Sequence, residues 1–382
     1  HEDKLTFSAI FTVDENARIH SRWFGKTLIN SDHRYTYESA QAVIDGKANL
    51  HDQDEAEGNK YAEELRTLNK LSKILRKRNA SAGAIEFSSD EVKIMLDEKG
   101  KPVKIIPKKA LDTHKLVEEF MLLANREVAK YIYDSIKRKG KKDTGAIYRI
   151  HDVPDRDRIR DLQTFVKLLG YDLRGQNGEV TAHDINHLLD QVEDTPHESL
   201  IRTATIRSMQ KAIYSTKNVG HFGLAFEFYT HFTSPIRRYP DLLVQRILEK
   251  HLKDQPFADT DIAALQKLAE SSTDREINAA KAERESKKLK QIEYMSERIG
   301  QIFQGTISGV ARWGVYVEDS ATKCEAIIPI ANLGEDYFIF QEKSYSIVGE
   351  KSKRRFTLGD AVKFKVKSVD MERKSVEAGL VE

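Results

Sequence analysis

The segment with the most chemical character is residues 220–248, which read GHFGLAFEFYTHFTSPIRRYPDLLVQRIL. A tight apolar turn opens it, and Ser234 followed by Pro235 predicts a helix start with serine as the N-cap. Arg237 and Arg238 then fall in the first helical turn, beside backbone N–H groups that have no partner within the helix. Guanidinium groups and free N–H groups together suit a phosphate.

Carboxylates near this segment offer a second interpretation of the two arginines. Asp241 and Glu227 lie close enough in the sequence to form ion pairs with Arg237 and Arg238. Such pairs would neutralise the guanidinium groups and give the segment a structural role. From the residues alone, the phosphate site and the ion pairs are equally supported.

Side chains that could hold a metal ion show no convincing spacing. Asp155, Asp157 and Asp161 lie close together, but three arginines separate them, which favours ion pairs on a helix surface. His183 and His187 are four residues apart on a predicted helix, as in a zinc pair, yet no glutamate follows His183. The sequence therefore predicts no metal site in this chain.

A basic run follows a long predicted helix. It spans residues 137–142 and begins with Lys137 and Arg138. Lysine and arginine can contact the phosphates of a nucleic acid and give salt-dependent affinity. Basic residues are equally expected at the C-terminal end of a helix, where they complement the helix dipole. Both interpretations stay open.

Aromatic residues gather near the C-terminus, where Phe303, Trp313 and Tyr316 alternate with small residues and Arg312 lies next to the tryptophan. On a small barrel, exposed aromatic rings beside cations suit single-stranded RNA. We expect some of the three rings to lie in the core, with Trp313 and Phe303 on the binding face. Residues 351–355 (KSKRR) add a second basic patch.

Hydrophobic spacing predicts the elements that position these residues. Strand–turn–strand patterns span residues 4–23 and 84–106, each with a polar turn. After Gly300, five short β-rich segments predict a barrel of the OB type. Apolar residues at helical spacing predict helices over residues 58–78, 114–138, 155–169, 181–193, 198–215, 236–253 and about 260–297.

Composition limits the class of protein. The chain has 382 residues, which suggests two or three domains, and it is 40% hydrophobic and 32% charged, as in globular proteins. The net charge is +2, so a nucleic-acid site must come from local clustering of basic residues. One cysteine, Cys324, excludes an internal disulfide framework and favours a reducing, cytoplasmic location. No apolar run reaches the roughly 18 residues that a membrane span needs.

Several separated blocks resemble the RNB family of exoribonucleases, which includes ribonucleases II and R. The central block is residues 231–241 (HFTSPIRRYPD), and the others follow in collinear order at residues 5–8, 27–29, 34–37, 117–125 and 148–152. The resemblance implies an α+β fold, with an RNB catalytic domain of mixed sheet and surrounding helices over residues 1–297. Residues 298–382 resemble the five-stranded OB-fold RNA-binding domain that follows RNB in these enzymes.

The resemblance implies processive 3′-to-5′ hydrolysis of single-stranded RNA to nucleoside 5′-monophosphates. The family uses two divalent metal ions, usually Mg²⁺, which activate water and stabilise the leaving oxygen. The family's aspartate cluster lies upstream of the block that opens this chain, so we expect the Mg²⁺ ligands to lie before His1. We therefore expect a C-terminal portion of a longer, monomeric enzyme that is inactive alone.

The resemblance also implies roles for individual residues. Arg237 resembles the arginine that contacts the scissile phosphate, and Glu283 a glutamate near the 3′-terminal nucleotide. Tyr37 resembles a tyrosine that helps to place the last nucleotides, and Phe87 an aromatic residue that stacks on a base. Without the resemblance, Phe87 reads as a core strand residue and Tyr37 as an ordinary helix-start residue.

A second hypothesis is a non-catalytic RNA-binding protein, built on an RNB-like shell and an OB barrel. Closely spaced aspartates before His1 in the full gene product would favour the enzyme, and their absence would favour the binding protein. A translation-associated RNA-binding protein would explain the barrel but not residues 217–248.

Overall fold

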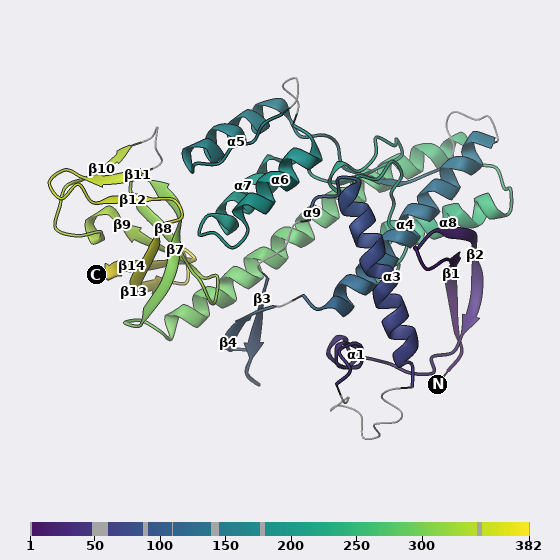
Figure 1. Ribbon diagram of the computed structural model, residues 1–382, viewed down its shortest axis with the longest axis horizontal. Helices are drawn as coiled ribbons and strands as arrows, with labels where there is room; N and C mark the ends of the chain where they lie inside the picture. The colour runs from purple at the N-terminus through teal and green to yellow at the C-terminus, as the bar shows by residue number, and fades with distance from the viewer. Residues whose placement is uncertain are drawn as a thin grey trace. The chain divides into compact units, whose positions relative to one another are not determined.

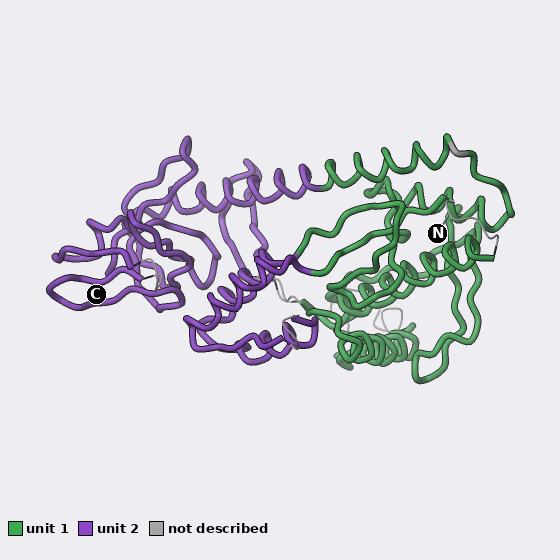
Figure 2. The backbone as a smooth tube through the Cα atoms, turned by 90° about the horizontal axis from the view of Figure 1, so that it is seen from above, with its two compact units in different colours: residues 1–86, 110–153, 210–276 green, residues 87–109, 154–209, 277–382 purple. Residues whose placement is uncertain are grey.

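The computed structural model divides the chain into two compact units. Unit 1 comprises residues 1–86, 110–153 and 210–276, and unit 2 comprises residues 87–109, 154–209 and 277–382 (Figure 2). Helix α9 (Asp259–Ser296), the long polar helix predicted from the sequence, contributes residues to both units. The predicted domain boundary near residue 298 stays a prediction. The structure describes residues 2–47, 60–86, 91–108, 110–138, 145–175, 180–341 and 346–381.

Two long helices of unit 1, α3 (Ala62–Ser81) and α4 (Asp112–Arg138), pack against each other (Figure 1). Leu71 and Leu75 of α3 join Leu123 of α4 in one buried apolar cluster. The helical spacing of apolar residues predicted both helices, because burial of one face stabilises each of them.

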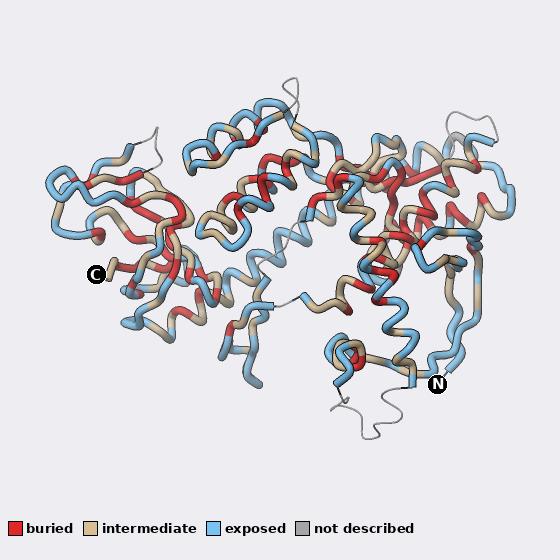
Figure 3. Tube along the Cα trace, viewed as in Figure 1, coloured by how far each residue is buried: buried red, intermediate tan, exposed pale blue. Residues whose placement is uncertain are grey.

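A second core of unit 1 forms where α4 meets α8 (Tyr239–Leu252). Val128 and Ile132 of α4 pack with Val244 and Leu248 of α8, and Figure 3 shows buried stretches alternating with exposed ones on these helices. The same core takes in side chains from β2 and from the first part of α9, namely Phe24, Leu265 and Ala269. This core fixes α8, the helix that follows the arginine-containing segment.

Strands β1 (Lys4–Val13) and β2 (Ile19–Ile29) form the predicted antiparallel hairpin. The carboxylate of Asp14 accepts hydrogen bonds from the backbone N–H groups of Asn16 and Arg18, at 2.9 and 2.8 Å. Ala17 has φ +56° and is buried in the cluster between α3 and α4. The turn is therefore tied both to its own backbone and to the helices.

Helix α4 buries a carboxyl group whose pKa lies near neutrality. Asn79 donates to Glu119 Oε2 at 2.9 Å, and burial, followed by the charge of Glu118, raises the pKa of Glu119 from 4.5 to about 7. The folded carboxyl binds its proton more tightly than the unfolded one. The stabilisation is fully present below pH 4.5 and is lost as the pH rises through 7.

We expect Glu119→Gln to remove this pH dependence. At pH 8 the unfolding free energy of the variant should exceed that of the parent by about 1 kcal/mol, a value that allows for screening by solvent. Near pH 4.5 the two unfolding free energies should be equal. Thermal unfolding between pH 4.5 and 8 measures this difference. Glu15→Gln, at an exposed turn position, is the control. Parallel curves for parent and Glu119→Gln would contradict the prediction.

Two predicted boundaries were wrong. The strand predicted over residues 84–96 does not include residues 84–86, and residues 87–90 lie outside the described residues. Strand β3 (Val92–Leu96) pairs with β4 (Pro102–Pro107). The backbone N–H of Ile85 instead donates to the carbonyl of Gly223 at 2.8 Å, which ties it to a loop. The predicted helix over residues 198–215 ends with α7 (Glu198–Ser208), because Met209 adopts an extended backbone.

The α+β class is confirmed, but the described strands of unit 1 form antiparallel pairs and not one larger mixed sheet. One pair is the β1–β2 hairpin. The other joins β5 (Tyr148–Ile150) to β6 (Ile213–Ser215), which falls within the segment predicted as helix. Strands of three residues offer few ladder positions, so neighbouring loops make most of the remaining contacts.

Unit 2 contains the predicted five-stranded barrel, closed in the order β13-β14-β9-β8-β7. Phe364, Val315 and Ile328 fill its interior, and Met295 from the last turns of α9 joins the same core. A Cβ atom at Gly305 would lie 2.1 Å from the carbonyl oxygen of Glu318, so glycine permits this strand approach. The barrel strands are β7 (Ile302–Ala311), β8 (Gly314–Asp319), β9 (Glu325–Pro329), β13 (Ala361–Asp370) and β14 (Ser375–Val381).

Unit 2 also holds a small antiparallel sheet that the sequence did not predict. It consists of β10 (Phe338–Gln341), β11 (Ser346–Gly349) and β12 (Arg355–Thr357). Unit 2 further contains helices α5 (Arg156–Leu168) and α6 (Ala182–Val192). Within the part of the chain that the structure describes, no helix combines the length and apolar character needed to cross a membrane.

Candidate functional site

The loop at residues 220–241 is anchored to the end of strand β5. His151 donates its N–H to the Gly220 carbonyl at 3.1 Å, and its own carbonyl accepts from Phe222 at 2.8 Å. The ring Nδ1 of His151 accepts from the Gly223 N–H at 3.0 Å. A Cβ atom at Gly223 would lie 2.9 Å from that nitrogen, so glycine permits the close approach. The start of the loop is thereby fixed.

The middle of the loop is held by buried polar groups from α4 and from the residue before β5. Asn125 accepts from the Phe232 N–H at 2.9 Å and donates to the Tyr229 hydroxyl at 3.3 Å. The Thr230 hydroxyl donates to the Ile147 carbonyl at 2.7 Å. The five residues that make these bonds are buried, so the bonds compete with little water and fix the loop.

The predicted N-cap at Ser234 was wrong, because α8 begins at Tyr239. Before it, the N–H groups of Arg237 and Arg238 both donate to the Ser234 carbonyl, at 3.3 and 3.0 Å, and form a separate turn. The carboxylate of Asp241 accepts from the Ser234 N–H at 2.7 Å. Ser234 therefore contacts α8 through its backbone N–H and not through its side chain.

The two arginines have different surroundings. Arg238 Nη2 donates to Asp241 at 2.8 Å, so the ion-pair interpretation is confirmed for Arg238. Asp241 is fully buried, and burial raises the pKa of its carboxyl group. Arg237 is exposed, and no carboxylate among the described residues pairs with its side chain. Arg237 therefore presents a guanidinium group that an anion can reach.

Three histidines of this loop and of the end of β5 carry no charge at neutral pH: His151 is buried, and His221 and His231 are half-buried. Burial first, then the charge of His151, lowers the pKa of His221 to about 3. Burial first, then Arg238, lowers the pKa of His231 to about 2. Burial also lowers the pKa of His151. The site is therefore positively charged through its arginines alone.

A second ion pair supports this part of the site. Arg149 donates to both carboxylate oxygens of Glu276, at 2.6 and 3.0 Å, and its guanidinium lies 4.6 Å from the centre of the Tyr214 ring. The Tyr214 hydroxyl lies 2.8 Å from His231 Nδ1. His221 and His231 were not predicted as site residues, although both belong to the segment that contains the two arginines.

The arrangement fits a phosphate ligand better than a metal ion. Within the described ranges, no three His, Cys, Asp or Glu side chains gather closely enough to hold a metal. Mg²⁺ needs clustered oxygen ligands, so these residues do not fit the two-metal site that the resemblance implies. Asp157 pairs with Arg160, and Asp155 caps α5, which accounts for two of the aspartates considered above.

The other predicted residues of unit 1 lie apart from this loop's contacts. Tyr37 begins α1 (Tyr37–Ile44) and stacks on His114, with ring centres 4.0 Å apart. No bond or ring contact in the described part of the chain joins Tyr37 to Arg237. Lys137 and Arg138 are exposed at the end of α4. Phe87 and residues 139–142 lie outside the described residues.

In unit 2, Glu283 is exposed on α9 and forms an ion pair with Lys287 at 2.7 Å. This partner lowers the pKa of the Glu283 carboxyl group. The proposed role of Glu283 beside a nucleotide stays a prediction.

The barrel presents an aromatic pair at the turn between β7 and β8. Trp313 is 60% exposed, and its Nε1 donates to the Tyr316 hydroxyl at 3.1 Å. Arg312 is exposed next to it. Phe303 is only partly exposed, because its ring stacks on the core residue Phe364 with centres 5.8 Å apart. Trp313 and Tyr316 are therefore the stronger candidates for contact with a base.

Comparison with known proteins identifies two domain families in the chain. Residues 1–254 match the RNB domain, and residues 296–379 match the S1 RNA binding domain. A protein of Aquifex aeolicus named Ribonuclease R is 34% identical over 383 residues, which cover 100% of this chain and 53% of that protein. The chain thus spans about half the length of this relative.

Solved structures agree with this assignment. Mycoplasma genitalium RNase R, in complex with ribose methylated single-stranded RNA, has a TM-score of 0.86 at 26% identity, covering 100% of this chain and 58% of its own. Yeast Ssd1, described as a pseudonuclease, has a TM-score of 0.67 at 18% identity, covering 91% of this chain and 41% of its own, and shares the fold alone. Because the RNB match extends over 254 of 382 residues, the chain belongs to the RNB family.

Proposed function

We propose that this chain is part of a processive 3′-to-5′ exoribonuclease that hydrolyses single-stranded RNA to nucleoside 5′-monophosphates. One observation carries the proposal: in an RNB-family chain, Arg237 is exposed and has no carboxylate partner among the described residues, at the end of a loop fixed by buried hydrogen bonds. The relative whose complex contains single-stranded RNA supports the class of substrate.

Arg237 would act on the scissile phosphate. As the phosphorus–oxygen bond breaks, negative charge grows on the phosphate oxygens, and a fixed guanidinium stabilises that charge without moving. Arg238 and Asp241 would act as positioning residues, since their ion pair holds the turn that carries Arg237. Tyr37 would place the last nucleotides, and Glu283 would lie near the 3′-terminal nucleotide.

The metal ions would require ligands beyond the described residues, which bring no suitable cluster together. We propose that the aspartates for Mg²⁺ precede His1, and that this chain alone turns RNA over little or not at all. We further propose that the protein works as a monomer in the cytoplasm, with the catalytic domain within residues 1–297 and the RNA-binding barrel within residues 298–382.

The experiment compares RNA degradation by this chain and by the product of the complete gene, with and without Mg²⁺. A 5′-labelled single strand should be shortened stepwise to mononucleotides by the complete product only when Mg²⁺ is present. Mg²⁺-dependent release of mononucleotides by this chain alone would contradict the proposed location of the metal ligands. Endonucleolytic fragments would contradict the exonuclease proposal.

A non-catalytic RNA-binding protein is the second candidate, because the yeast relative in fold is described as a pseudonuclease. In that case the complete product would bind RNA with Mg²⁺ present and leave the strand intact. The same assay therefore separates the two candidates.

The barrel gives a prediction that either candidate shares. We expect Trp313→Ala to weaken binding of single-stranded RNA by about 1–3 kcal/mol, because one base loses its stacking partner. The Tm should not change, since Trp313 is 60% exposed. Fluorescence anisotropy with a labelled oligonucleotide measures the affinity. Tyr337→Ala, which removes another ring of unit 2 that is 70% exposed, is the control. Equal effects of both variants would count against a specific role for Trp313.

A further inference from the structure

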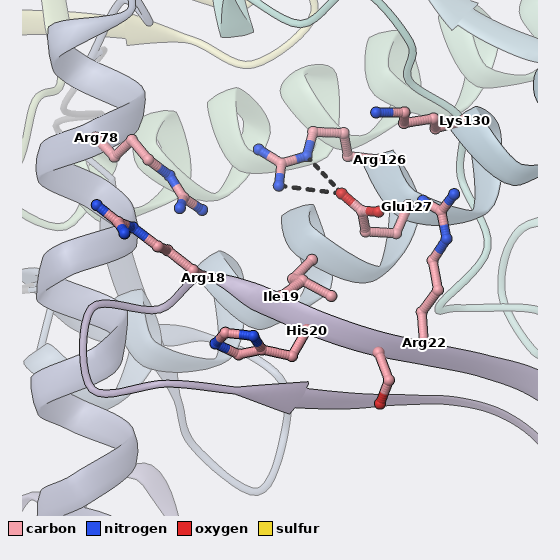
Figure 4. Close-up of a pocket in the computed structure, with 9 residues that line it drawn as sticks. Arg18, Ile19, His20, Arg22, Arg78, Arg126, Glu127 and Lys130 are labelled. Carbon is pink, nitrogen blue, oxygen red and sulfur yellow. Dashed lines mark hydrogen bonds and ion pairs between the residues drawn. The ribbon is translucent and has the colours of Figure 1, made fainter.

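Unit 1 contains a second basic site that shares no residue with the loop at 220–241. It is a cavity of about 490 Å³ between the β1–β2 turn, α3 and α4 (Figure 4). Arg18 and Arg22 come from the hairpin, Arg78 from α3, and Arg126 and Lys130 from α4. Three separate elements thus bring five cationic side chains to one cavity.

One carboxylate, Glu127, faces these five cations. Arg22 Nη1 donates to Glu127 Oε2 at 2.7 Å, and Arg126 donates to Oε1 from Nε and Nη2, both at 3.2 Å. Both carboxylate oxygens are occupied in this way, and Figure 4 shows Glu127 between the two arginines. Asp134, which is not part of the lining, approaches Arg22 at 3.4 Å. Glu127 therefore orients two guanidinium groups but cannot neutralise the cavity.

The other three cations have no carboxylate partner among the described residues. Arg78 Nη1 donates to the carbonyl of Ala17 at 3.1 Å, which is a neutral acceptor. Arg18 and Lys130 are exposed and make no side-chain hydrogen bond or ion pair within the described ranges. Burial, and then the positive charge of Arg126, lowers the pKa of Arg78. Like charges held this close repel one another, so a bound anion would relieve the repulsion.

We propose that this cavity binds phosphate groups. Guanidinium forks match the oxygens of a phosphate in pairs, and a cluster of arginines is the protein surface that favours phosphate most. The lining has Ile19 and His20 but no phenylalanine, tyrosine or tryptophan, and His20 points its Nε2 at Asp14, 3.2 Å away. With five cations and no phenylalanine, tyrosine or tryptophan in its lining, the site suits phosphate better than a base.

Phosphate groups of this kind have two sources. They are either neighbouring phosphates of an RNA strand or the phosphates of a small oligophosphate. The cavity requires no RNA hydrolysis in either case, so this inference does not depend on the proposed function.

The test uses the full chain and inorganic tripolyphosphate, with binding measured by isothermal titration calorimetry at 0.15 M salt. The variant Arg18→Ala/Lys130→Ala removes the two exposed cations, whose side chains make no contact that the fold needs. We expect it to weaken tripolyphosphate binding at least tenfold, because each lost cation removes a charge-assisted hydrogen bond. The Tm should match that of the parent.

The matched control is Lys77→Ala/Lys267→Ala, which lowers the net charge of the same unit equally at exposed positions that do not line the cavity. This control should change the affinity less than twofold. Equal weakening by both double variants would overturn the proposal, because only net charge would then count. Failure of the parent to bind tripolyphosphate would overturn it as well.

A second arm identifies the source of the phosphates. The affinity for a single-stranded RNA oligonucleotide is measured against salt concentration. Two contacts with strand phosphates contribute about 1.4 to the slope of log K against log salt. If the slope for Arg18→Ala/Lys130→Ala is smaller by this amount than the slope for the parent, the site binds RNA. An unchanged slope, together with weakened tripolyphosphate binding, assigns it to a small phosphate ligand.

Discussion

Replacing Arg237 with alanine is expected to lower kcat for RNA hydrolysis by the complete gene product about 10²- to 10³-fold, with the Tm unchanged. The side chain is exposed and pairs with no carboxylate in the described part of the chain, so its loss breaks no ion pair among those residues. However, the variant lacks the positive charge that stabilises the phosphate in the transition state. Steady-state kinetics and thermal unfolding measure the two quantities.

The ratio of kinetic constants tests how Arg237 acts. An interaction made only in the transition state lowers kcat and kcat/KM equally, whereas an interaction that also holds the ground state raises KM. Arg237→Lys keeps the charge but loses the fork of donors, so it should recover only part of the activity. Arg246→Ala, at an exposed position of α8, is the control. An unchanged kcat in Arg237→Ala would exclude the proposed role.

Regular elements of this fold follow from sequence periodicity. Helix α4 carries a broad apolar face at helical spacing, and burial of that face against α3 and α8 decides its position. The barrel strands alternate and are separated by turn residues, so their number and order of appearance were also predictable. In both cases local pattern and tertiary packing agree.

The loop at residues 220–241 escaped prediction in detail, because single tertiary contacts decide it. The start of α8 moves from Ser234 to Tyr239 since a buried carboxylate seven residues ahead bonds the Ser234 backbone. Likewise, the neutral state of His231 depends on burial and on the charge of Arg238. Neither effect has a local signature in the sequence.

The basic cavity also depends on tertiary contacts that have no local signature in the sequence. Arg18, Arg78 and Lys130 are separated by more than fifty residues from one to the next, so no motif or charge run contains them. The net charge of the whole chain is +2, so it does not predict a basic cavity either. Their proximity arises only when the hairpin turn packs between α3 and α4, through buried Ala17.

Replacing Asp241 with alanine should give the largest loss of stability of the variants considered. The carboxylate is fully buried and accepts from the Ser234 N–H and from Arg238 at 2.7 and 2.8 Å. Alanine would leave the guanidinium of Arg238 without its counter-charge and the Ser234 N–H without a partner. Breaking a buried pair from one side costs about 3–5 kcal/mol. Chemical denaturation of the full chain measures this loss.

The variant Arg238→Ala/Asp241→Ala separates the cost of the unpaired charge from the value of the pair. If the unpaired guanidinium causes most of the loss, the double variant should be more stable than Asp241→Ala, because no charge is left buried. Asp241→Asn keeps one acceptor oxygen for Ser234 and should recover part of the stability. It should also recover part of the kcat of the complete gene product, since the turn that carries Arg237 is retained. If Asp241→Ala were as stable as the parent, this ion pair would not hold the turn, and the position of Arg237 would have to depend on the bonds of Asn125 and Thr230 alone.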